Sequence, residues 1–188
     1  TVYSYDLQQR SRIQDTVTYN PYGKPGLIDV ATRTISFATL SREYRSVKIT
    51  DSYNAKGESV ALRTFNAVYL SAGEEVFTDG FDERNTYDSD GRTVLQKNVY
   101  TFSLDKSSSA VHTISLEGST YYLIYSSVQI TRNLQYDHSN RNVMVQDSEF
   151  YSLYQENDPD PAMSYKGLNF VKRGGAYSEN SLFASNGV

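Results

Sequence analysis

Two histidines set the limit on the chemistry that this chain could perform. His112 lies in Ser109–Ile114, a stretch typical of a strand, and His138 lies at the tip of a predicted hairpin. A catalytic zinc site needs several histidines or carboxylates converging from neighbouring strands, and a serine triad needs a histidine beside an activated serine. The sequence has no cysteine and no nucleophile-elbow motif. We therefore predict no catalytic residue and no cofactor.

Four aspartates in two acidic segments are the candidates for a metal site. Asp79 and Asp82 belong to the first segment, and Asp88 and Asp90 belong to the second. Taken as loops, both segments present the carboxylate oxygens that Ca²⁺ prefers. Aspartate and glycine are also ordinary turn residues, and the second segment lacks the distal glutamate of an EF-hand loop. We predict no bound metal, with calcium as the candidate ion if one binds.

A stretch near the C-terminus, Phe170–Tyr177, resembles the C-terminal motif of jelly-roll alginate lyases. Arg42–Arg45 and Gln129–Thr131 are loosely similar to the other two motifs of that family. The resemblance implies that Tyr177 would transfer the proton, while Arg45 and Gln129 would neutralise the uronate carboxylate. The chain departs from the family in having Thr131 in place of a histidine and an additional glycine in the last motif. A polysaccharide-lyase-like β-sandwich is therefore kept as an alternative.

The charges argue against two classes of partner. The formal net charge is −4, from 18 basic and 22 acidic side chains, and no run of five like charges occurs. Nucleic-acid binding depends on clustered cations, so we expect no nucleic-acid partner. The longest strongly apolar run, Tyr121–Tyr125, is far shorter than a membrane-spanning helix, so we expect no membrane span.

The elements that would position any site are predicted to be strands. Apolar and polar residues alternate with a period of two, as in Val47 and Ile49, in Thr93–Leu104 and in Asn142–Tyr151. Helical spacing is scarce. We predict an all-β fold with little helix, an antiparallel sandwich or a jelly-roll-like meander of hairpins. Residues 1–188 are expected to form a single β-domain, with the segment 163–188 packed on it or extending from it.

Hairpin turns provide the clearest internal repeat. The pattern Tyr, Asn or Asp, two residues, then Gly ends at Gly23, Gly57 and Gly91, and its tyrosines are evenly spaced at positions 19, 53 and 87. A fourth copy ends at Asn140, which also tolerates a positive φ angle. These loops are similar to the YD-type repeats of large bacterial toxin shells, at the turn residues only. They predict a meander of similar hairpins.

The leading functional hypothesis is assembly. The first segment alternates like a strand through Val2, Tyr3, Tyr5 and Leu7, and a terminal strand can pair with its own sheet or with the sheet edge of another copy. The 17 tyrosines suit either pleated strands or a recognition face. We therefore expect a non-enzymatic structural or adhesive β-domain of a surface fibre, pilus or virion, located outside the cell or on a surface and binding copies of itself. The alternative is a glycan-binding or polysaccharide-lyase-like β-sandwich.

Overall fold

The computed structural model describes residues 1–20, 28–29, 34–35, 41–70, 74–107, 109–137 and 142–179. These residues form strands and no helix, which confirms the predicted all-β class. No helix long and apolar enough to cross a membrane occurs among them.

The small strands β3 (Ile28–Asp29) and β4 (Thr34–Ile35) pair with each other. The other eleven strands form one antiparallel sheet: β1 (Val2–Tyr5), β2 (Ser11–Asn20), β5 (Ser41–Tyr53), β6 (Ser59–Tyr69), β7 (Glu75–Tyr87), β8 (Val94–Asp105), β9 (Thr113–Leu116), β10 (Ser119–Asp137), β11 (Asn142–Leu153), β12 (Met163–Tyr165) and β13 (Leu168–Glu179).

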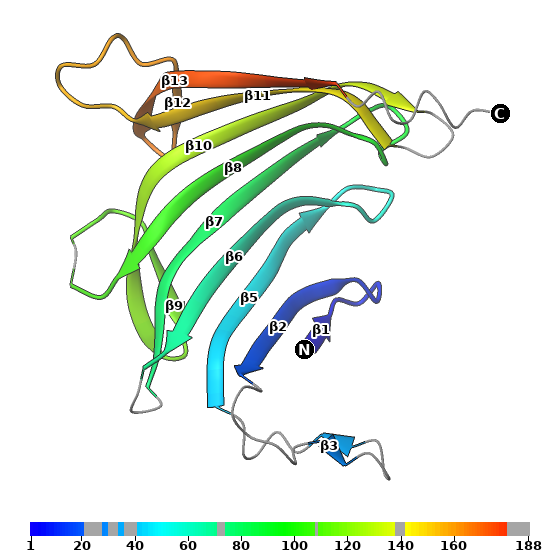
Figure 1. Ribbon diagram of the computed structural model, residues 1–188, viewed down its shortest axis with the longest axis vertical. Helices are drawn as coiled ribbons and strands as arrows, with labels where there is room; N and C mark the ends of the chain where they lie inside the picture. The colour runs from blue at the N-terminus through cyan, green and yellow to red at the C-terminus, as the bar shows by residue number, and fades with distance from the viewer. Residues whose placement is uncertain are drawn as a thin grey trace.

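Strands that follow one another in the chain mostly lie side by side, as the repeated hairpin pattern predicts. The order across the sheet is β1-β2-β5-β6-β7-β8-β10-β11-β13-β12, with β9 paired to the first part of β10 (Figure 1). The segment from Met163 to Glu179 therefore supplies the last two strands of the same sheet. The predicted meander is confirmed, and it takes the form of a single curled sheet.

The long strand β10 shows how the sequence bends this sheet. Its buried side chains alternate through Tyr121, Leu123 and Tyr125, and the alternation then resumes one residue out of phase at Val128. The pairing with β8 shifts register at the same place, where Ser126 is the additional residue. A bulge of this kind bends the strand and increases its twist. Most neighbouring pairs in the sheet carry such a shift, which accounts for its strong curl.

The curl allows the sheet to cover its own inner face. The β9–β10 hairpin packs over β5 and β7, where the rings of Phe77 and Tyr121 meet edge to face with centroids 5.7 Å apart. At the rim of this contact the Arg45 guanidinium lies 2.9 Å from the Glu117 carboxylate. Phe65 and Phe102 are almost completely buried beneath these elements, and burial of each such side chain contributes roughly 1.5–3 kcal/mol.

A buried ionic cluster fastens the other end of the sheet to the same face. Asp82 of β7 is completely buried, and its Oδ2 atom accepts hydrogen bonds from the hydroxyls of Tyr125 at 2.7 Å and Tyr165 at 2.9 Å. Lys166, in the turn between β12 and β13, places Nζ 2.8 Å from the same oxygen. Tyr165 also stacks on Tyr100 with ring centroids 3.6 Å apart. The contacts of Tyr165 and Lys166 with Asp82 join residues more than eighty positions apart and hold the β12–β13 turn on the inner face.

Ionisation in this cluster follows from its contacts. Burial opposes the charge on Asp82, but hydrogen bonds from Lys166 and Tyr125 outweigh it and keep the pKa of Asp82 below its ordinary value. Burial raises the pKa of Tyr125, and it raises that of Tyr165 to about 12. The cluster is therefore an ion pair braced by two neutral hydroxyls.

The predicted turn glycines lie as follows. Gly57 has a φ of 85° between β5 and β6, where Asn54 Oδ1 accepts hydrogen bonds from the Lys56 and Glu58 amides. Gly91 has a φ of 71° between β7 and β8, and its amide donates to the Asp88 carbonyl. Glycine adopts such angles without the steric cost of a Cβ atom. Gly23 and Asn140 lie outside the described residues.

Candidate ligand-binding groove

The three residues of the lyase resemblance are not brought together. Arg45 lies on β5 and Tyr177 on β13, and five other strands lie between them in the sheet. Gln129 lies on β10, between β8 and β11. The Arg45 guanidinium already contacts three carboxylates, those of Asp15, Glu75 and Glu117. The geometry therefore offers no shared site for a uronate at these positions.

The acidic segments also have other partners. Asp79 and Asp82 lie inside strand β7, so the expectation of a loop there is wrong; alternation with Phe77 and Phe81 keeps this segment extended. Asp82 bonds to Lys166, whereas Asp88 and Asp90 accept backbone hydrogen bonds within the β7–β8 turn. Among the described residues, no group of three or more His, Asp or Glu side chains is arranged to hold a metal ion.

The histidines fall in different situations. His112 precedes β9 and lies in the connection from β8, where its Nε2 atom is 2.9 Å from the Lys166 carbonyl oxygen. The prediction that residues 109–114 form one strand is therefore wrong in its first part, since β9 begins at Thr113. His138 lies outside the described residues.

The predicted assembly strand forms one edge of the sheet. β1 pairs with β2 on one side, and no described strand pairs with its other side. Its apolar side chains remain in solvent: Val2 is 72% exposed, Tyr5 is 60% exposed and Leu7, just after the strand, is 97% exposed. Tyr3 stacks on Tyr5, with ring centroids 6.1 Å apart.

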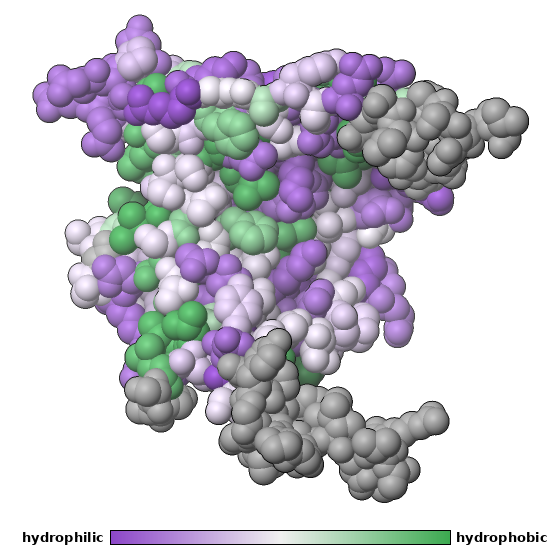
Figure 2. Space-filling view, viewed as in Figure 1, coloured by the Kyte–Doolittle hydropathy of each residue, from purple (hydrophilic) through white to green (hydrophobic). Residues whose placement is uncertain are grey.

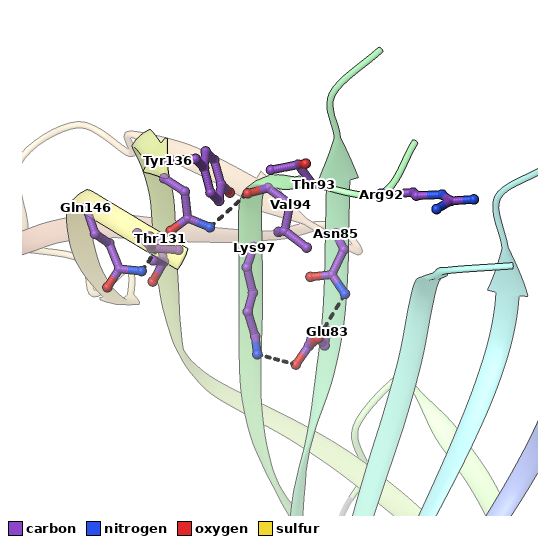
Figure 3. Close-up of a pocket in the computed structure, with 11 residues that line it drawn as sticks. Glu83, Asn85, Arg92, Thr93, Val94, Lys97, Thr131, Tyr136 and Gln146 are labelled. Atoms are coloured by element: carbon purple, nitrogen blue, oxygen red, sulfur yellow. Dashed lines mark hydrogen bonds and ion pairs between the residues drawn. The ribbon is translucent and has the colours of Figure 1, made fainter. Parts of the chain in front are cut away.

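Figure 3 shows a polar groove that the sequence did not single out. It lies on the opposite face of the sheet from Asp82. Glu83 and Asn85 alternate with Asp82 along β7 and so point to the other side. The groove occupies about 370 Å³ at the end of the sheet where β7 and β10 finish and β8 and β11 begin. Its walls come from those four strands and from the β7–β8 turn: Glu83, Asn85, Arg92, Thr93, Val94, Lys97, Thr131, Asn133, Tyr136, Val143 and Gln146.

The polar side chains of this groove hold one another in fixed orientations. Lys97 Nζ lies 2.8 Å from one Glu83 oxygen, and Asn85 Nδ2 donates to the other at 2.9 Å. On the β10 wall, Gln146 Nε2 donates to Asn133 Oδ1 at 2.8 Å, and Asn133 Nδ2 donates to the Val94 carbonyl at 2.8 Å. Side chains that are oriented before a ligand arrives lose little conformational freedom on binding it.

Asn85 and Tyr136 line the groove, and each has a buried side-chain oxygen without a hydrogen-bond partner among the described residues. Asn85 is only 9% exposed as a residue, and both hydrogens of its amide are used, by Glu83 Oε1 and by the Ser59 carbonyl. Its Oδ1 atom is buried without a hydrogen-bond partner among the described residues. A buried acceptor left unpaired costs about 1–3 kcal/mol, so this position is destabilising in the fold as it stands.

Tyr136 supplies the aromatic part of the wall. Tyr136 lies near the end of β10, where it pairs with Val143 of β11. Burial raises the pKa of the Tyr136 hydroxyl, which therefore stays neutral at physiological pH. The groove thus combines amides, one ion pair and a neutral aromatic ring.

The sequence carried only a faint signal for this site. Its residues are Asn, Gln, Thr, Lys and Glu at alternating positions, a pattern that equally describes any solvated strand face. The register is what gathers them, because Lys97 pairs with both Asn85 and Thr131, and Asn133 pairs with Gln146. Comparison with families of known proteins, with curated protein sequences and with solved structures finds no match to this chain.

Proposed function

We propose that this chain is a glycan-binding β-domain, and that the polar groove is its binding site. The observation that carries the proposal is the set of amide and carboxyl groups that line the groove and hold one another in fixed orientations. A sugar presents several hydroxyls, each of which can donate and accept a hydrogen bond. Amides and carboxylates complement that pattern, and an aromatic ring such as that of Tyr136 can pack against the apolar face of a sugar.

Size and charge agree with this ligand class. The groove volume of about 370 Å³ falls in the range of small-molecule sites, which begins at roughly 300 Å³. Glu83 and Lys97 form an ion pair, and Arg92 adds one positive charge at the rim, so the groove suits neutral or acidic sugars. Recognition of a glycan fits an adhesive domain of a surface fibre, pilus or virion.

The experiment is a glycan array followed by titration of the best ligand by calorimetry. Asn133→Ala removes a side chain from the groove wall, and Gln135→Ala, an exposed position on the same strand that does not line the groove, is the matched control. We expect the first variant to weaken binding about tenfold, the loss of one or two hydrogen bonds, and the second to leave it unchanged. Absence of binding across the array, or equal effects of the two variants, would overturn the proposal.

Self-association through β1 is the second candidate function. It is favoured by the outer edge of β1, which carries exposed apolar side chains and lacks a partner among the described strands. Such an edge is a template for another strand, and proteins that avoid pairing place charges there. Light scattering across a wide concentration range should detect oligomers, and Tyr3→Lys should disperse them. Dispersed monomers of the unaltered chain at all concentrations would exclude this candidate.

A further inference from the structure

A second cavity lies away from the polar groove and shares no lining residue with it. It occupies about 420 Å³ between the β8–β9 connection, the first half of β10 and the β12–β13 turn. Most of its wall is apolar, from Val111, Leu123, Ile124, Leu153 and Leu168. The cavity therefore suits a ligand with an apolar body.

One end of this apolar cavity is polar, because Lys166 and His112 line it. Lys166 Nζ lies 2.8 Å from Asp82 Oδ2 and 2.6 Å from the Tyr125 hydroxyl. An ammonium group has three hydrogens, so one remains for a ligand. The Nε2 atom of His112 must donate to the Lys166 carbonyl, since a carbonyl oxygen only accepts. In the neutral ring the other nitrogen is then an acceptor.

The charge balance at this end decides what kind of head group fits. The positive charge of Lys166 is already paired with Asp82, which is completely buried. Arg84 reaches the same cluster through the Tyr165 hydroxyl at 3.4 Å but does not line the cavity. A carboxylate on the ligand would add a second buried anion beside Asp82, and a ligand ammonium would add a second cation beside Lys166. Either charge would be costly to desolvate without a partner. A hydroxyl group avoids both costs, because it can accept from Lys166 and donate to His112.

We propose that the apolar cavity binds a small neutral molecule with an apolar body and one hydroxyl group. Apolar side chains at the rim of the cavity are exposed to solvent, which favours binding of a ligand that would cover them: Val111 is 91% exposed and Ile124 is 38% exposed. Figure 2 shows hydrophobic residues reaching the surface on the side where the β8–β9 connection projects. A ligand seated in the cavity would cover part of this apolar surface and gain the corresponding free energy.

Three probes of equal chain length, 1-octanol, octanoate and octylammonium, test the head-group prediction by titration calorimetry or NMR. We expect 1-octanol to bind at least tenfold more tightly than either charged probe. His112→Phe keeps an aromatic ring but removes the acceptor, so the affinity for 1-octanol should fall about tenfold. A charged probe that binds as tightly as 1-octanol, or no binding of any probe, overturns the proposal.

Location is tested by filling the cavity from its rim. Ala110→Phe introduces a bulky ring at a lining position, and Ala55→Phe introduces the same ring at an exposed turn far from it in the sheet. The first variant should abolish binding of 1-octanol and the second should leave it unchanged. Retained binding in Ala110→Phe would place the ligand elsewhere and overturn the assignment. Glycan binding in the same variants reports separately on the polar groove.

Discussion

Asp82 and Glu83 are neighbours in strand β7, yet they belong to two different kinds of polar site. Asp82 points to the covered face, where it is completely buried and receives a cation and two hydroxyls on one oxygen. Glu83 points to the other face, where it pairs with a half-exposed lysine beside an open groove. A carboxylate–lysine ion pair thus holds the fold together on one face, and on the other face the same kind of pair lines a groove that has room for a ligand. Solvent access, rather than residue type, separates the two roles.

The largest effect should come from breaking the buried pair. Lys166→Met keeps an unbranched side chain but leaves Asp82 buried without its directly bonded cation. Removing one partner of a buried ion pair costs about 3–5 kcal/mol, because the remaining charge loses its compensation. Urea unfolding followed by circular dichroism at neutral pH measures this loss. A change below about 1 kcal/mol would show that Asp82 is hydrated and that the cluster does not fasten the β12–β13 turn.

The next effect concerns packing on the Asp82 face. A Cβ atom at Gly80 would lie 2.1 Å from the Thr64 carbonyl oxygen and 2.7 Å from the Phe102 ring. Neither the strand nor the buried ring can move away freely, so Gly80→Ala should cost about 1–3 kcal/mol or more. Gly174→Ala on β13 is the control, because nothing lies within 4 Å of its added Cβ. Equal unfolding midpoints for the two variants would contradict the close approach of Phe102 to β7.

A smaller effect is expected from acid. The pKa of Asp82 lies below its ordinary value of 3.8, and bonds from Lys172 and Arg132 lower the pKa of Glu149 from 4.5 to about 2. Groups with a depressed folded-state pKa stabilise the fold above their ordinary pKa, and this stability is lost as pH falls. The free energy of unfolding should therefore decrease below about pH 4.5, towards pH 2.

The Lys166→Met variant should respond to acid in the opposite sense. Without its cation, Asp82 is a buried carboxyl whose folded-state pKa rises above the ordinary value. Protonation then removes the uncompensated charge, so the difference in stability between variant and unaltered chain should shrink as pH falls. Parallel pH profiles for the two proteins would indicate that the variant fails for a reason unrelated to Asp82.

The contrast between Asp82 and Glu83 also shows which features the sequence could predict. Alternation at Val47 and Ile49 predicted strands because one buried face imposes a period of two. The acidic segment around Asp79 and Asp82 was expected in a loop because aspartate and glycine are ordinary turn residues. Composition alone also does not reveal that the lysine at position 166 contacts Asp82. The phase change at Ser126 is equally invisible without the pairing of β8 and β10. Both sites depend on such long-range register, so their residues could be read from the sequence only as separate polar positions.

The smallest expected effect on stability comes from repeating the lysine change on the groove face. Lys97 is 44% exposed and its Glu83 partner 12% exposed, so water can replace much of the interaction. Lys97→Met should therefore cost no more than about 1 kcal/mol in urea unfolding, several times less than Lys166→Met. The same change frees Glu83 and alters the charge of the groove, so it should weaken binding of an acidic glycan while the fold persists. If Lys97→Met instead destabilised the chain as much as Lys166→Met, the two faces would not differ in solvent access, and the groove would be part of the packed structure rather than a binding site.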